Sequence, residues 1–196
     1  SCGIRAVTRA LACLVLVLPA LAAASGGGNV MQVPNNNVGD VASLQRGARN
    51  FVNYCSGCHS AKYIRFSKLQ EALQLSEQQV TENLMFAARK TDEMMTVAMP
   101  AESAALWFGQ APPDLTLTAR SRGTDWIYTF LKSFYADDKR PTGVNNLMLP
   151  NTSMPHILWE LQGVQKASFY ETKEQDGTVI DHFGDPAHFA NFEEGT

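Results

Sequence analysis

The sequence predicts a mainly α-helical protein in which a few helices are joined by long loops. Apolar residues recur at helical spacing in several segments, stretches rich in Gly, Pro and Asn separate them, and no convincing sheet or repeat is visible. Hydrophobic residues make up 45% of the 196 residues, enough for one sizeable core. We therefore expect one domain, with loops of the length that usually wraps a functional group.

The first 24 residues have the pattern of a secretory signal peptide. Arg5 and Arg9 supply positive charge, residues 10–24 are apolar, and small residues precede Ser25. The apolar run of 15 residues is short for a bilayer span of about 20, which favours a cleaved signal over an uncleaved anchor. Residues 25–40, rich in Gly and Asn, are expected to form an irregular lead-in.

The charge balance argues against a nucleic-acid partner. The net charge is −3, and removal of residues 1–24 leaves 14 basic against 19 acidic residues, a net charge of −5. Neutralising phosphates requires clustered Lys and Arg, which are not evident here. A mildly acidic protein of this kind can instead attract a basic protein partner.

The first two predicted helices precede residue 91. In the first, one helical face carries Leu44, Ala48, Phe51, Val52 and Cys55. The second begins at Ser76, because Ser76 and Gln79 have the spacing of a capping box, and continues over residues 77–90.

Shorter helices are predicted downstream, between loops at residues 109–123 and 137–153. Pro100 suits the first position of a helix that reaches about Phe108. Thr124 suits the N-cap of a helix whose apolar face is Ile127, Phe130, Leu131 and Phe134. Another short helix follows Pro155 and ends near Gly163, and a small hairpin is expected around Asp176-Gly177, within residues 171–185.

One motif carries specific chemistry. Cys55-Ser56-Gly57-Cys58-His59 fits C-x-x-C-H, the attachment signature of c-type haem. At i, i+3 and i+4 on a helix, three side chains project to one side. Two thiols can then add to the two vinyl groups of one porphyrin while the imidazole ligates its iron. The motif therefore predicts one covalent haem c, bound through Cys55 and Cys58.

Two other uses of the cysteine pair are less favoured. A disulfide is possible in an oxidising compartment, but it would leave His59 without a role. A zinc site would need further ligands, for which His156, His182 and His188 are the candidates, and the mature chain has no second cysteine pair.

An electron-transfer haem needs a sixth iron ligand, and a thioether would raise its reduction potential. Two methionines, Met99 and Met154, stand before proline in predicted loops, where an extended backbone helps to direct the side chain. Met154 is favoured over Met99, because it ends a long loop just before a helix. His156 is a rival ligand of a different kind.

Haem propionates need cationic partners when they are buried. Arg120 and Arg122, before the helix that contains Trp126, are candidates, although both can also be ordinary surface arginines. Trp126 is expected to be a core residue rather than an electron conduit.

Three blocks of sequence, in this order, resemble the cytochrome c1 family, in a proteobacterial variant. They are FVNYCSGCHSAKYIRFSKL, APPDLTLTARSRGTDWIYTFLKSFY and RPTGVNNLMLPNTSMPHILWELQG, and the resemblance runs from Leu44 to Gly163. It implies a class I cytochrome c-like fold with long loops wrapping one haem, over residues 41–196.

The resemblance also assigns roles to residues. Cys55 and Cys58 would hold the haem, His59 and Met154 would ligate its iron, Pro113 would line the haem edge, and Arg120 would pair a propionate, with Arg122 still possible. Family members usually end in a transmembrane helix, which is not present in this chain, so we expect a C-terminal anchor beyond Thr196.

The implied function is electron transfer within the ubiquinol–cytochrome c oxidoreductase (bc1) complex, on the periplasmic side of the bacterial inner membrane. The subunit would itself catalyse no bond-making step. Its partners would be cytochrome b, the Rieske iron–sulfur protein and an acceptor c-type cytochrome. Residues 160–194, with eight acidic residues and two lysines, would suit docking of a basic cytochrome. The alternative is a soluble periplasmic haem enzyme, such as a peroxidase or a small-molecule reductase, which needs an open sixth position.

Overall fold

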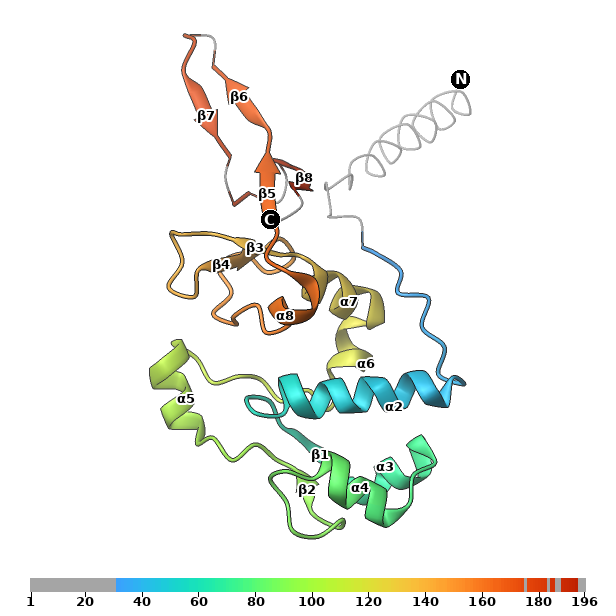
Figure 1. The fold of residues 1–196 in the computed structure, drawn as a ribbon. Helices are drawn as coiled ribbons and strands as arrows, with labels where there is room; N and C mark the ends of the chain where they lie inside the picture. Colours follow the sequence, from blue (N-terminus) through green and yellow to red (C-terminus); the bar gives the residue numbers. More distant parts are fainter. Residues whose placement is uncertain (1–30, 175, 183, 186–187, 194–196) are drawn as a thin grey trace, which may run out of the picture.

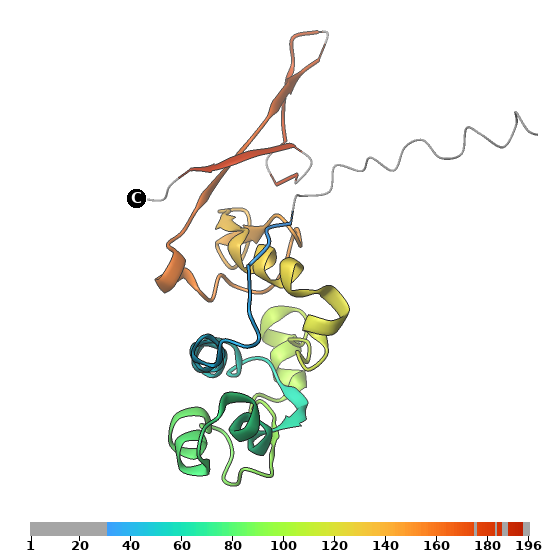
Figure 2. The ribbon, with the colours of Figure 1, turned by 90° about the vertical axis from the view of Figure 1, so that its right-hand side faces the viewer.

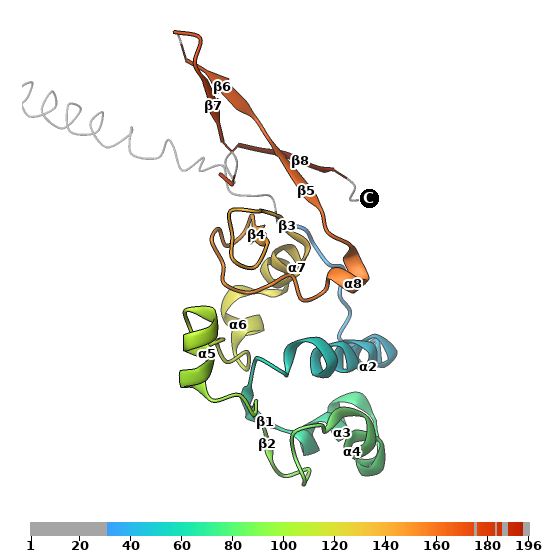
Figure 3. The ribbon, with the colours of Figure 1, turned by 60° about the vertical axis from the view of Figure 1, so that its left-hand side comes forward.

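A computed structural model describes residues 31–174, 176–182, 184–185 and 188–193. The predicted signal peptide lies outside these residues. The elements are stacked in layers, with helix α2 (Val41–Asn50) in the middle of the molecule. Helices α3 (Phe66–Leu73) and α4 (Glu77–Leu84) lie on one side of it, and α7 (Thr124–Lys132) lies on the other (Figures 1 and 3).

Helix α2 confirms the first predicted helix and extends it in an unusual form. The Asp40 side chain caps its start by accepting a hydrogen bond from the backbone N–H of Ser43. The helix then widens into a single π-helical segment, Phe51–Cys55, in which the N–H of Ser56 bonds to the carbonyl of Phe51. Such segments often occur at functional sites.

The capping box at Ser76 is confirmed. Its hydroxyl accepts from the N–H of Gln79, and the Gln79 side chain accepts from the N–H of Ser76. Helix α4 nevertheless ends at Leu84 rather than at residue 90, because Met85 already has an extended backbone. Helix α3, directly before α4, was not predicted.

The middle of the chain is more helical than expected. Helix α5 (Ala101–Phe108) is present, with Pro100 as its N-cap rather than its first residue, and it ends at Gly109, whose φ of 78° suits glycine. The prediction that residues 109–123 are only a loop is wrong, since they contain α6 (Thr118–Arg122). The N-cap of α7 is Gly123 rather than the predicted Thr124.

The expectation of no sheet is also wrong. The described residues form four two-stranded antiparallel sheets. They pair β1 (Ala61–Arg65) with β2 (Met94–Met95), β3 (Phe134–Ala136) with β4 (Val144–Asn146), β5 (Lys166–Phe169) with β8 (Phe189–Glu193), and β6 (Glu171–Lys173) with β7 (Val179–Asp181). The β6–β7 pair is the predicted hairpin. Phe134, which was expected on a helix, is the first residue of β3. Because of these strands, the description of the protein as mainly α-helical holds only loosely.

Two hydrophobic clusters replace the single core that was expected. The first lies beneath α2 and includes Val52, Val80 and Leu84. The second lies around α7 and the β3–β4 pair and includes Phe130 and Phe134. The short helix predicted after Pro155 is α8 (Trp159–Gln162), which ends at Gly163 as expected. Figure 2 shows the part that contains the first cluster below the part that contains the second, with the paired strands β5 and β8 above both.

None of the helices in the described part of the chain has both the length and the apolar composition needed to cross a bilayer.

Candidate haem-binding site

The C-x-x-C-H motif lies where the π-helical segment ends. Cys55 is the last residue of that segment, and its carbonyl accepts hydrogen bonds from the N–H groups of Cys58 and His59 at 3.1 and 2.9 Å. This turn keeps the three side chains close together. Both cysteines are free thiols and half-buried, so the structure does not support the disulfide alternative. Burial, with Cys58 as a second cause, raises the pKa of the Cys55 thiol.

His59 is oriented by a backbone group distant in sequence. Its Nδ1 lies 2.8 Å from the carbonyl oxygen of Pro113. A carbonyl oxygen can only accept, so Nδ1 must carry the proton and the lone pair is left on Nε2. This is the arrangement in which a histidine ligates a metal through one nitrogen while the other is fixed by an outer partner.

The segment that supplies this carbonyl is itself tied down. The N–H of Leu115 donates to the carbonyl of Ser60 at 2.8 Å. The Asp114 carboxylate accepts from the N–H of Lys62 at 2.8 Å and from the N–H of Thr116 at 3.0 Å. Partial burial opposes ionisation, but hydrogen bonds from Thr116 and Lys62 hold the pKa of the Asp114 carboxyl below its usual value. Asp114 was not singled out from the sequence.

A cavity of about 240 Å³ lies beside Cys58, and its lining includes Met99, Pro112 and Asp114. It is smaller than the pockets of roughly 300–1,000 Å³ that enclose most cofactors. Met99 and Cys58 therefore lie close to the same space, whereas Met154 does not line it.

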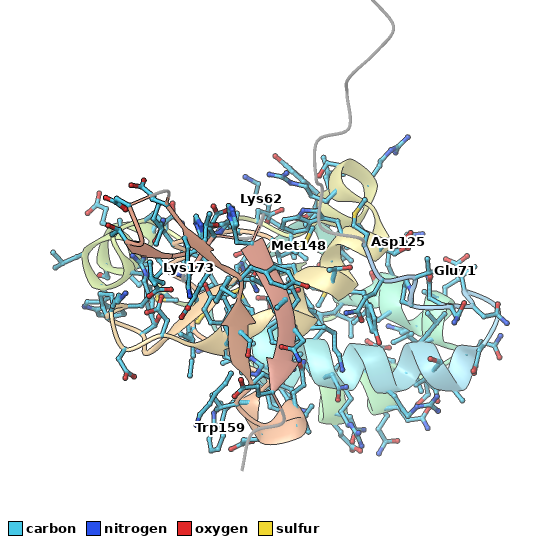
Figure 4. All side chains as sticks on the ribbon, turned by 90° about the horizontal axis from the view of Figure 1, so that it is seen from above. Lys62, Glu71, Asp125, Met148, Trp159 and Lys173 are labelled. Carbon is cyan, nitrogen blue, oxygen red and sulfur yellow. The ribbon has the colours of Figure 1, made fainter. Side chains whose placement is uncertain are left out.

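Met154 belongs to the second hydrophobic cluster, where it packs half-buried against Phe130, Phe134 and Val144. Met148 packs against the same cluster, and Figure 4 places it near the centre of the molecule seen from above. Met154 thus packs in a different cluster from Val52 and Ala61, the buried residues on either side of the attachment motif.

Two buried asparagines, read from the sequence only as loop residues, organise the loop before Met154. The Asn146 side chain donates to the carbonyl of Phe130 at 2.7 Å and accepts from the N–H groups of Met148 and Leu149. The Asn145 side chain donates to Asp137 and accepts from the N–H groups of residues 146 and 151. The sequence does not distinguish these two asparagines from ordinary turn residues, because Asn is common in turns.

A column of aromatic rings joins α7 to the loop after Met154. Trp126 stacks on Phe130, Phe130 meets Phe134 edge to face, and Phe134 stacks on His156, each pair with ring centroids 5.2 Å apart. His156 is buried, and its Nε2 lies 3.0 Å from the carbonyl of Gly163. Burial lowers its pKa. Nε2 therefore carries the proton, while Nδ1 is buried and has no hydrogen-bond partner among the described residues, so His156 keeps a lone pair and remains a rival ligand.

The two candidate arginines are both exposed on α6 but have different surroundings. The guanidinium of Arg122 lies 4.9 Å from the centroid of the Trp126 ring. Within the described part of the chain, Arg120 makes no side-chain hydrogen bond or ion pair. Arg120 is therefore the freer of the two for an anionic partner.

The zinc alternative for the cysteines has no support in the described residues. The group of three potential ligands found there is His182, Asp185 and His188, which excludes Cys55 and Cys58.

Comparison with known proteins agrees with the motif and with the histidine geometry. The model of the cytochrome C1 family matches residues 35–183. A cytochrome c1 of Allochromatium vinosum is 47% identical over 167 residues, which cover 85% of this chain and 68% of that protein. A protein of Nitrosomonas europaea named ammonia monooxygenase gamma subunit is 40% identical, over 77% of this chain and 64% of its own length. The chain therefore belongs to the cytochrome c1 family of haem-bearing electron-transfer subunits of the bc1 complex.

Proposed function

We propose that haem c is held between the Cys55–His59 segment and the loop that carries Met154, and that it relays single electrons from a Rieske iron–sulfur protein to a c-type cytochrome. The observation that carries this proposal is the hydrogen bond between His59 and Pro113. It leaves Nε2 of His59 free, beside two unlinked thiols. The haem iron supplies the one-electron couple.

The separation of the two hydrophobic clusters supports the proposed position of the haem. A flat, largely apolar ring between the cluster of Val52 and that of Phe130 would cover apolar groups of both. His59 and Met154 would then be the two residues that hold the haem iron, and the Met154 thioether would raise the reduction potential of the haem.

Met99 is less suited to this role, although it lies close to Cys58. The cavity that it lines is also lined by Pro112 and Asp114, the neighbours of the residue that bonds to Nδ1 of His59. Met99 is not part of the cluster around Phe130, against which Met154 packs. A haem that covers both clusters would therefore be held by Met154 rather than by Met99.

Ligand substitutions test the assignment. In the haem-loaded protein, Met154→Ala should let carbon monoxide bind the reduced iron and should lower the reduction potential. Met99→Ala is the matched control and should leave both properties unchanged. Fast binding of carbon monoxide to the unmutated protein would instead favour a periplasmic haem enzyme, since only an open sixth position allows it.

Attachment and partners need separate tests. Cys55→Ser and Cys58→Ser together should abolish haem staining on a denaturing gel, because only covalent haem survives denaturation.

For the partners, we propose assembly with cytochrome b and a Rieske protein on the periplasmic side of the inner membrane. The acidic residues between 160 and 194 would steer a basic cytochrome, so electron transfer to it should slow steeply with added salt.

A further inference from the structure

A second cluster of metal-ligating side chains lies in the connection between β7 and β8. His182 directly follows β7, His188 directly precedes β8, and Asp185 lies halfway between them. Each of the three side chains offers one ligand atom, and these atoms all lie within 4.8 Å of one another. We propose that they form a binding site for one divalent transition-metal ion of the zinc type. This inference is independent of the haem.

The backbone of the connection sets the spacing of the three residues. The N–H of Asp185 donates to the carbonyl of His182 at 2.9 Å, and the N–H of His188 donates to the carbonyl of Asp185 at 3.0 Å. These two hydrogen bonds link the backbones of the three proposed ligands. The connection is anchored to β5 and β6, because the N–H of Tyr170 donates to the carbonyl of His188 at 2.7 Å.

The packing beneath the connection is aromatic. The ring of Phe189, the residue after His188, meets Phe169 edge to face, and Phe169 meets Tyr135 in the same way. The hydroxyl of Tyr135 lies 3.6 Å from the position that a Cβ on Gly184 would occupy. These contacts tie Phe189, the residue after His188, to β5 and β3.

The hydrogen bonds of the three side chains fit metal binding. The hydroxyl of Thr172 lies 2.8 Å from Nε2 of His182. If Nε2 donates to this hydroxyl, Nδ1 keeps its lone pair for the ion, and Thr172 is the outer partner that metal-ligating histidines normally have. Asp185 already lies 2.8 Å from Nδ1 of His188, so the carboxylate and the imidazole face one another.

The chemistry of the three ligands selects the ion. Neutral imidazoles suit zinc, copper and nickel, while calcium and magnesium prefer oxygen ligands alone. Three protein ligands leave the fourth position of a tetrahedral zinc for water. The His188 and Asp185 side chains are 36% and 46% exposed, so an ion and its water can reach them from solvent.

Binding has to change the histidine rings in a detectable way. The rings of His182 and His188 are stacked in parallel, with centroids 3.6 Å apart and planes 4° apart. One ion cannot lie in the planes of two parallel rings, so metal binding must rotate one ring away from the other. Addition of Zn²⁺ to the full haem-loaded chain should therefore shift the NMR signals of both rings together, saturating at one ion per chain.

Calorimetry with Zn²⁺ tests the same site through variants. His182→Gln, Asp185→Asn and His188→Gln should each weaken binding by at least about 10-fold, and Thr172→Val by about 10-fold, as for other outer partners. Asp176→Asn, the same change in the neighbouring β6–β7 turn, is the matched control and should bind normally.

Either of two results would overturn the site. One is the absence of stoichiometric binding, with the signals of both rings unmoved in the unmutated chain. The other is binding that survives His188→Gln. Circular dichroism and the haem spectrum of each variant show that the fold is intact.

Discussion

The Nδ1 nitrogen of His59 is bonded to the carbonyl oxygen of Pro113, which follows it by 54 residues. The proposed iron ligand is thus oriented by the backbone of a distant loop rather than by a neighbouring side chain. Because that loop is held by Asp114 and Ser60, its hydrogen bonds bear on both the stability of the protein and the basicity of the ligand.

Replacing Asp114 should loosen this loop. Asp114→Ala leaves the N–H groups of Lys62 and Thr116 without their carboxylate acceptor, so the free energy of unfolding should fall by about 1–2 kcal/mol. The Pro113 carbonyl would hold His59 less firmly, the imidazole would be less basic, and the reduction potential should rise. Urea unfolding and redox titration measure the two effects. Asp138→Ala, at an exposed site, should change neither.

Asn146 should be the most sensitive residue of the loop that precedes Met154. Asn146→Ala removes one buried and two partly buried hydrogen bonds and should destabilise the protein by about 2–4 kcal/mol. With the loop less ordered, the iron should also bind carbon monoxide more readily. Asn83→Ala, on the exposed face of α4, is the control. An Asn146 variant as stable as the unmutated protein would contradict this account of the loop.

Substitutions of the two candidate arginines of α6 should have different effects on the reduction potential of the haem. Arg120→Gln removes a positive charge that has no protein partner among the described residues, so pairing with a propionate predicts a lower potential. Arg122→Gln should leave the potential unchanged and cost about 0.5–1 kcal/mol of stability, through loss of its contact with Trp126. Equal effects on the potential would remove the distinction between them.

Because of Tyr135, we expect the free energy of unfolding to fall at alkaline pH. Burial, with Asp137 as a second cause, raises the pKa of its phenol to about 12. Between pH 10 and 12 the unfolded chain releases this proton while the folded chain keeps it, so the stabilisation present below about pH 10 declines as the pH rises, by up to about 3 kcal/mol. Urea unfolding at pH 9 and 11 measures the decline.

The matched variants for this pH dependence are two conservative changes. Tyr135→Phe should abolish Tyr135's share of the decline, and Tyr170→Phe, at a site that is 63% exposed, should retain it. A decline of the same size in Tyr135→Phe would assign it to other groups.

Local patterns predicted the parts of the structure that local interactions determine. The capping box at Ser76 and the helical face before Cys55 depend on neighbours within four residues, and both are present. Strand β1 pairs with β2, about 30 residues further along, and neither is long enough to show an alternating pattern. Helix α6 has too few apolar residues to show a periodicity.

The candidate site divides in the same way. The Cys55–His59 spacing is visible in five consecutive letters, whereas the contact with Pro113 is made by a carbonyl that every residue has. The burial of Asn146 depends on packing between β4 and α7, which no single segment encodes. Sequence patterns therefore identify the residues with reactive side chains, but they do not identify the backbone and side-chain groups that orient those side chains.

The π-helical segment before the motif means that spacing alone does not define an attachment signal. Each residue of an α-helix rotates the chain by about 100° about the helix axis, whereas a wider π turn holds more residues and so rotates the chain less per residue. The segment Phe51–Cys55 therefore changes the direction in which the two cysteine side chains project from the axis of the preceding helix. The same five letters grafted onto an unbroken helix would point the thiols in another direction. Transplanting this haem site into a new scaffold thus requires copying the rotation of the helix before the motif as well as the five residues of the motif.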